Sequence, residues 1–136
     1  MFDNDYILHT AALVASCNAT VVAGATMVTI GDGLLEANAV IDVTAIEIAS
    51  NDELYTICVQ GSSESDFAST VVNLAILELG AKEVLNYSDV DSTIGRYILP
   101  VRNEVNGTKY PYLRLICDVA GAVATGINFT ARLEKR

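Results

Sequence analysis

Side chains with catalytic chemistry are few and widely separated in this sequence of 136 residues. Histidine, the usual general base of a nucleophilic triad, occurs once, at His9 near the amino terminus. No serine or cysteine stands at a recognisable catalytic spacing from this histidine. We therefore do not expect a serine or cysteine hydrolase.

Acidic residues occur in neighbouring pairs, and a glycosidase uses two carboxylates to cleave its substrate. The pairs are Asp42 with Glu47, Asp52 with Glu53, and Asp89 with Asp91. A glycosidase cleft also presents aromatic side chains to the sugar, but this chain has no tryptophan and only 7% aromatic residues. We interpret the pairs as solvated loop carboxylates.

The stretch YSDVDST places Asp89 and Asp91 two residues apart, with Ser88 and Ser92 beside them. Alternating oxygen ligands of this kind suit Ca²⁺, but a calcium loop usually has three or more of them and a glycine at its sharp turn. The sequence leaves open both a cation site and a plain turn.

The three cysteines, Cys17, Cys58 and Cys117, are widely spaced and form no Cys-x-x-Cys pair, which argues against a disulfide scaffold or a zinc site. Cys58 and Cys117 lie within apolar strand patterns, where a cysteine acts as a small buried hydrophobe. The first residues, MFDND, are acidic where a secretory signal is basic, and no apolar run reaches the ~18 residues of a membrane span. We expect a protein made in a reducing cytosol, without a cofactor.

Acidic residues outnumber basic residues by 17 to 8, which gives a formal net charge of −9. Nucleic-acid binding depends on Lys and Arg side chains that neutralise phosphates, and the basic residues here cluster only at the carboxyl-terminal tail. Anionic membranes also repel an acidic surface. The charge therefore argues against nucleic-acid and membrane partners.

The stretch KYPYLRLICDVAG, residues 109–121, alternates between an apolar row and a second row that begins with Tyr110, Tyr112 and Arg114. No acid, base or metal ligand accompanies these three residues, so they do not predict catalysis. Tyr and Arg are enriched at protein interfaces. The row is either a partner-binding surface or the outer face of a sheet without a partner.

The elements that position this row are β-strands. Val, Ile, Thr and Tyr are frequent, Gly, Asn and Asp punctuate the chain, and about seven to nine short strands result. The run STVVNLAILELGA would permit a helix, but its β-branched residues favour a strand. The alternation through residues 41–48 changes phase, which predicts a bulge or two short strands.

Two further signals concern the strand RYILPV and its successor. Pro100 lacks a backbone donor, so its strand is expected at an edge or at a bend. Asn106-Gly107 is a strong hairpin signal and is expected to join RYILPV to the stretch at 109–121. We predict a single all-β domain over residues 1–136, an antiparallel β-sandwich of jelly-roll type, with residues 1–16 as an extended or short helical lead-in.

The order of motifs resembles the small β-sandwich capsid cement (decoration) proteins of tailed bacteriophages. The motifs are MFDNDYILHTAALVASCNAT, GDGLLEANAV, TAIEIASNDELYTICVQGSSESDF and, closest of all, the tail GRYILPVRNEVNGTKYPYLRLICDVAGAVATGINFTARLEK. In that family a similar tail forms a Tyr-Leu-Arg-Leu strand, a Gly/Ala/Thr turn and a final strand. The resemblance covers nearly the whole chain and is weakest over the first 38 residues.

The resemblance implies a non-enzymatic jelly roll, made in the host cytoplasm, that binds the outside of the capsid and clamps neighbouring major capsid protein subunits. It also implies a homo-oligomer, a dimer or a trimer. Two alternatives remain open: another virion β-module of the tail, head-completion or fibre kind, and a carbohydrate-binding β-sandwich. A six- or twelvefold ring would favour the tail or portal.

Overall fold

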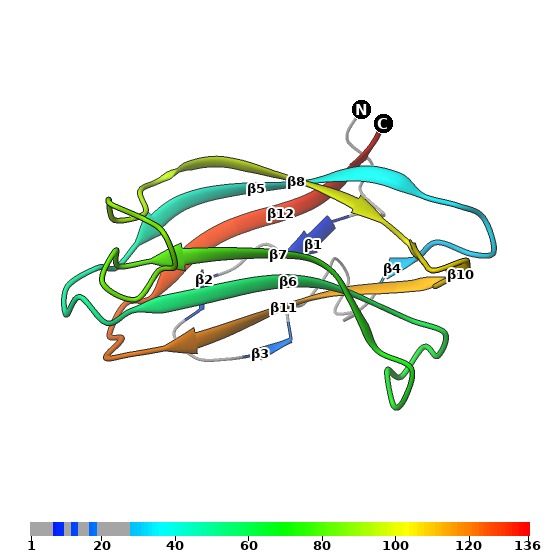
Figure 1. Cartoon of the computed structure of the whole chain (residues 1–136), viewed down its shortest axis with the longest axis horizontal. Helices are drawn as coiled ribbons and strands as arrows, with labels where there is room; N and C mark the ends of the chain where they lie inside the picture. The colour runs from blue at the N-terminus through cyan, green and yellow to red at the C-terminus, as the bar shows by residue number, and fades with distance from the viewer. Residues whose placement is uncertain (1–6, 10–11, 14–16, 19–27) are drawn as a thin grey trace.

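The computed structural model describes residues 28–136 and, as backbone strands, Ile7–His9, Ala12–Leu13 and Cys17–Asn18. Throughout this described part the secondary structure is β-strand, and no helix occurs in it. Two antiparallel sheets pack face to face (Figure 1). The antiparallel β-sandwich predicted from the sequence is confirmed.

Each sheet is a path of four strands with one short strand beside it. The first has the order β1-β12-β5-β8, with β2 beside β12, and the second has the order β3-β11-β6-β7, with β4 beside β11. The short strands are β1 (Ile7–His9), β2 (Ala12–Leu13), β3 (Cys17–Asn18) and β4 (Val28–Thr29). The long strands are β5 (Glu36–Ile46), β6 (Leu54–Ser62), β7 (Val72–Gly80), β8 (Gly95–Arg102), β11 (Tyr112–Ala120) and β12 (Ile127–Lys135).

The strands pair in a nested order along the chain. The innermost pair is β6 with β7, the next is β5 with β8, and the outer pairs join β3 and β4 to β11 and β1 and β2 to β12. Successive long strands therefore cross repeatedly from one sheet to the other. This nested order is compatible with the predicted jelly roll, which stays a prediction.

The core lies between the two sheets and is built by strict alternation of side chains. In β12, Ile127, Phe129, Ala131 and Leu133 are buried, whereas Asn128 and Thr130 between them are exposed. The same period of two buries Tyr55, Ile57 and Val59 in β6 and Leu113, Leu115 and Cys117 in β11. These inward rows are the ones that the sequence pattern predicted.

Three finer predictions about the strands are confirmed. The ambiguous run becomes strand β7, and Pro100 lies in β8 at the edge of its sheet, where its missing donor costs no ladder bond. The phase change in β5 is a bulge, because Val43 pairs with Phe129 and Ala45 with Asn128, which leaves Thr44 as the extra residue.

The hairpin prediction is wrong in its partners. Asn106 and Gly107 both have positive φ and form a two-residue turn, but this turn closes a separate ribbon of β9 (Glu104–Val105) and β10 (Thr108–Lys109). Strand β8 pairs with β5 and strand β11 pairs with β6, so the two lie in different sheets. The ribbon forms the connection by which the chain passes from β8 in the first sheet to β11 in the second.

The lead-in predicted over residues 1–16 is described only in part. Its strands β1 and β2 both pair with β12, and residues 1–6, 10–11 and 14–16 lie outside the described residues. The three loops 47–53, 81–94 and 121–126 gather at one end of the sandwich, at the left of Figure 1. We call this end the β7–β8 end, after the longest of its loops.

Candidate functional site

The row predicted to bind a partner lies on the outer side of the second sheet and just before it. Tyr112 and Arg114 belong to β11, Tyr110 precedes the strand, and all three are half-buried. The guanidinium of Arg114 donates from Nε to Oε1 of Gln60 at 3.0 Å. It also lies 4.4 Å from the centre of the Phe67 ring, a cation–π contact.

Phe67 belongs to the loop 63–71, which is folded tightly against β11. Its backbone has φ of 53°, a strained conformation for a bulky residue, and its side chain is 9% exposed. The Ser62 hydroxyl donates to the carbonyl of Ser69, and Glu64 accepts from the amide and hydroxyl of Ser69. Arg114 therefore anchors this loop, and a partner contact of Tyr110, Tyr112 and Arg114 stays a prediction.

Asn103 is a fully buried polar residue behind Tyr110. Its Oδ1 accepts from the amide of Leu35 at 2.8 Å, and its Nδ2 donates to the carbonyls of Gly33 and Tyr110. It ties together segments about 70 residues apart in the chain. Sequence reasoning missed this residue, because a single Asn after a strand is the ordinary signal of a turn.

Two of the carboxylates that the sequence paired, Glu47 and Glu53, accept hydrogen bonds from the backbone of loops at the β7–β8 end. Oε2 of Glu47 accepts from the amides of Ala124, Thr125 and Gly126 at 2.9, 2.7 and 2.8 Å. The hydrogen bonds from Gly126 and Thr125 are the main reason that the pKa of Glu47 lies below its usual value. The anion thus holds the β11–β12 loop to the end of β5.

Glu53 is the only acidic side chain in the described part of the chain that is completely buried. Its Oε1 accepts from the amides of Ala49 and Ser50, and its Oε2 from the amide of Asp52. Burial by itself raises the pKa of this carboxyl, but the backbone hydrogen bonds together bring the pKa below its usual value. Glu53 therefore holds the β5–β6 loop as an anion.

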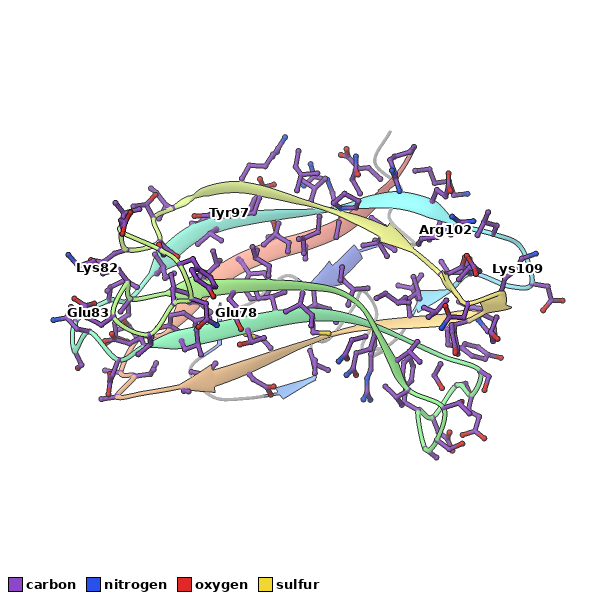
Figure 2. The ribbon with its side chains drawn as sticks, viewed as in Figure 1. Glu78, Lys82, Glu83, Tyr97, Arg102 and Lys109 are labelled. Carbon is purple, nitrogen blue, oxygen red and sulfur yellow. The ribbon has the colours of Figure 1, made fainter. Side chains whose placement is uncertain are left out.

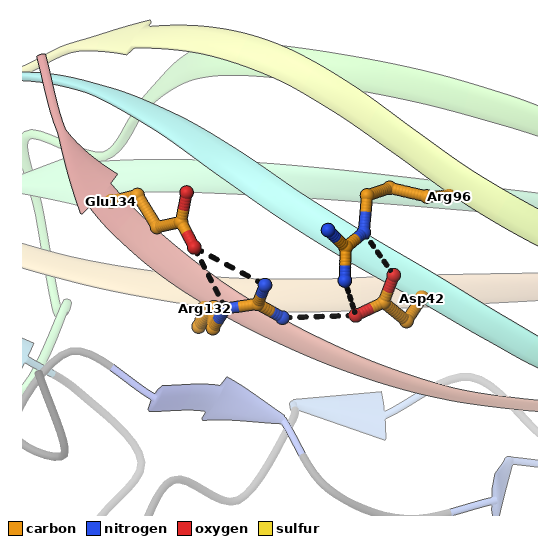
Figure 3. A network of polar contacts seen from close by, with 4 residues as sticks. All are labelled: Asp42, Arg96, Arg132 and Glu134. Carbon is orange, nitrogen blue, oxygen red and sulfur yellow. Dashed lines mark hydrogen bonds and ion pairs between the residues drawn. The ribbon is translucent and has the colours of Figure 1, made fainter. Parts of the chain in front are cut away.

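Asp42 lies in β5, on the outer face of the first sheet, and joins three strands (Figure 3). Its oxygens accept from Nε of Arg96 at 2.6 Å and from Nη1 of Arg132 at 2.9 Å, and Arg132 also pairs with Glu134. The hydrogen bonds from Arg96 and then Arg132 lower the pKa of Asp42. The interpretation as solvated loop carboxylates is therefore wrong for Asp42, which is in a strand, and for Glu53, which is buried.

The other residues considered for chemistry are also separated. His9 lies in β1, and its side chain is outside the described residues. Oδ1 of Asp91 accepts from the amide of Lys82 at 2.9 Å, while Asp89 is exposed. Over the described residues, no group of three or more His, Cys, Asp or Glu side chains is placed to hold a metal ion.

Sequence reasoning missed that four apolar side chains of the β7–β8 loop are exposed. Val84, Tyr87, Val90 and Ile94 are 37%, 107%, 71% and 63% exposed, and we call these four residues the apolar loop cluster. Tyr87 also has a positive φ of 59°, an uncommon backbone conformation for a bulky residue. The apolar residues within LNYSDVDSTIG were the available signal, because a solvated loop gains nothing from them.

An open hollow of about 370 Å³ lies between this loop and the neighbouring strands. Leu77, Glu78 and Leu79 of β7 line one side, and Tyr97 of β8 and several loop residues line the rest. Figure 2 shows Glu78, Lys82, Glu83 and Tyr97 at the β7–β8 end, while Arg102 and Lys109 lie at the opposite end. A second hollow of about 340 Å³ lies beside the chain's carboxyl terminus, lined by residues such as Leu34 and Lys135.

Most of the buried or paired polar groups described above therefore stabilise the fold. The exposed apolar side chains and the two hollows are the surfaces at which a partner could bind. In the part of the chain that the structure covers, no helix is long and apolar enough to cross a membrane. Comparison with protein-family models, with curated proteins and with solved structures found no match to this chain.

Proposed function

We propose that this chain is a capsid decoration protein that binds the outer surface of a phage head and clamps neighbouring subunits of the major capsid protein. In this proposal it is made in the host cytoplasm, forms a dimer or trimer and acts without catalysis. The proposal rests on one structural observation and on the resemblance of its motifs, above all of the tail at residues 95–135, to those of cement proteins.

The observation that carries the proposal is the apolar loop cluster at one end of the sandwich. Tyr87, Val90 and Ile94 each expose well over half of their surface on a single loop of an acidic protein. Large exposed apolar groups of this kind are characteristic of protein-binding surfaces, and Tyr is enriched among the residues that dominate binding energy. This favours a protein partner over a small-molecule substrate.

The carboxylate anchors support the same proposal. Glu47, Glu53 and Asp52 hold the loops 47–53 and 121–126 through hydrogen bonds to their backbone amides, and Asp91 does the same for the β7–β8 loop. Loops fixed in advance lose less conformational entropy when a partner binds. A decoration protein benefits from this, because many copies of a modest contact act together on a symmetric shell.

Cosedimentation with capsids tests the proposal. The protein is mixed with DNA-free heads of the phage that encodes it, and bound and free protein are separated by pelleting. We expect saturable binding that weakens about tenfold or more in Tyr87→Ala with Ile94→Ala, since truncation of a binding hot spot typically costs that much. Leu34→Ala, at the opposite end and 46% exposed, is the matched control and keeps the affinity.

Two results would overturn the proposal. If the protein does not pellet with heads even when it is added in large molar excess over the capsid subunits, the proposal is rejected. Binding to isolated tails or fibres in place of heads would assign the chain to another kind of virion module.

A further inference from the structure

The two sheets leave two long edge strands, and only one of them is protected against pairing. Edge strands usually carry proline or charged residues that prevent the addition of another strand. Strand β8 carries Pro100, Arg96 and Arg102. Strand β7, with the sequence VNLAILELG, has no proline and a single charged residue, Glu78.

The register of β6 and β7 shows which backbone groups of β7 point away from the sheet. The amide of Ala81 donates to the carbonyl of Glu53, so the odd-numbered residues of this part of β7 bond to β6. Gly80 points the other way, because its amide donates to Oγ of Ser92 and its carbonyl accepts from the amide of Ser92. By the same alternation, Ile76 and Glu78 direct their N–H and C=O groups outward.

The outward-pointing backbone groups are interrupted at both ends of β7. Only those in the middle of the strand are left without a neighbouring strand among the described residues. Ser92 occupies the edge at Gly80 in the manner of a partner strand. The bulge at Leu74, between the pairs Val59–Ala75 and Gln60–Asn73, ends the regular ladder on the other side. Within the described residues, Ile76 and Glu78 gain no strand partner on their outer side. The Ile76 side chain is 53% exposed.

The hollow of about 370 Å³ reaches this free edge at Glu78, which lines it together with Leu77 and Leu79. Its far wall includes Tyr97, whose hydroxyl is fixed by a 2.8 Å hydrogen bond to the carbonyl of Thr93. The volume falls in the range of about 300–1,000 Å³ that is usual for ligand pockets. A strand from another protein that added to this edge could therefore bond to the outward backbone groups of Ile76 and Glu78 and place a side chain in the hollow.

The charge around the edge selects the guest. Glu78 is exposed on this edge and Asp91 is exposed in the lining of the hollow. Figure 2 places Lys82 and Glu83 farther out, at the tip of the β7–β8 end, and Arg102 and Lys109 at the opposite end of the molecule. A second copy of this acidic chain would bring another Glu78 edge against the first. An extended segment that alternates apolar and basic residues complements both the hollow and the carboxylates.

We propose that the outer edge of β7, at Ile76 and Glu78, is a strand-addition site for an extended segment of another protein with alternating apolar and basic residues. The inference stands on the edge geometry and is independent of the capsid role.

Amide hydrogen exchange, followed residue by residue by NMR, tests the site with a blocked hexapeptide of alternating lysine and valine as the probe. In the free protein, the amides of Ile76 and Glu78 exchange fast, while those of Leu77 and Leu79 are protected by β6. Saturating peptide is expected to slow exchange at Ile76 and Glu78 about tenfold or more. A hexapeptide of glutamate and valine is the matched control and leaves both rates unchanged.

Two variants separate the backbone and charge contributions. Ile76→Pro removes an outward N–H that makes no ladder bond, so the fold persists and the peptide no longer binds. Glu78→Lys keeps the backbone edge, but it should lower the affinity for the lysine peptide several-fold and raise the affinity for the glutamate peptide. This variant still tests the inference if the proline variant fails to fold.

Three results would overturn the inference. The first is fast exchange at Ile76 and Glu78 with saturating lysine peptide, and the second is equal protection by both peptides. The third is protection that rises with protein concentration alone, which would assign the edge to a second copy of the chain.

Discussion

At the scale of single residues, polar groups that resemble catalytic ones in the sequence stabilise the fold. Glu47 and Glu53 each accept several backbone amides, and Asn103 uses both ends of its amide. The contacts of Glu47 and Asn103 were not predictable, because Glu47 and Gly126 are 79 positions apart and Asn103 and Leu35 are 68 apart. Only the folded sheets bring them together, so their spacing in the chain carried no signal.

The Glu47 anchor predicts a specific pH dependence. Its pKa is lower in the folded protein than the ordinary 4.5, so its contribution to stability is complete above that value and is lost as the pH falls through the folded pKa. Glu47→Gln should lower Tm by about 5 °C at pH 7, and the difference from wild type should shrink well below pH 4.5. Thermal unfolding of both proteins across this range measures it, and a difference that is constant with pH would contradict the anchor.

Gly121 allows a test of the close packing between the β11–β12 loop and Asp52, because a side chain at position 121 would clash with the backbone of Asp52. Its φ is 91°, and an added Cβ would lie 2.2 Å from the carbonyl oxygen of Asp52. Gly107 has nearly the same φ, 87°, but open space around it. Urea unfolding should show a loss of about 1 kcal/mol for Gly107→Ala from the backbone conformation alone, and a clearly larger loss for Gly121→Ala. Equal losses would refute the close approach.

At the scale of elements, the strands were predictable and their connections were not. Alternation in β6, β11 and β12 identified the buried rows, and Pro100 identified an edge, because both signals act within one strand. Asn106-Gly107 predicted a turn correctly but assigned it the wrong strands, since a turn signal does not specify which sheet the chain enters next. The row of Tyr112 and Arg114 was placed correctly on the outer side, yet the contact of Arg114 with the loop at Phe67 was not foreseen.

The contact of Arg114 with Gln60 and Phe67 predicts local stabilisation of the loop 63–71. Arg114→Ala should cost about 1 kcal/mol, from the lost cation–π contact and hydrogen bond, and should speed amide exchange across that loop. Arg102→Ala is the control, because Arg102 is 52% exposed and its ion pairs span 3.3 and 3.8 Å, so it should change stability little. Unchanged exchange in the loop of the Arg114 variant would show that the loop is held by its own hydrogen bonds.

At the scale of the whole molecule, the two ends of the sandwich differ in chemistry. The β7–β8 end combines the apolar loop cluster, loops fixed by carboxylates and an acidic strand edge, while Arg102 and Lys109 lie at the other end (Figures 1 and 2). A molecule with such ends is suited to bind in one orientation. The proposed decoration of a capsid uses this polarity, with the apolar loop cluster facing the shell.

The most direct measurement is an electron cryomicroscopy reconstruction of phage heads incubated with the purified protein. The proposal predicts added density on the outer surface of the shell, at positions shared by neighbouring capsid subunits, with the loop 81–94 at the contact. Heads that remain bare at saturating protein, or density found only on the tail, would contradict it.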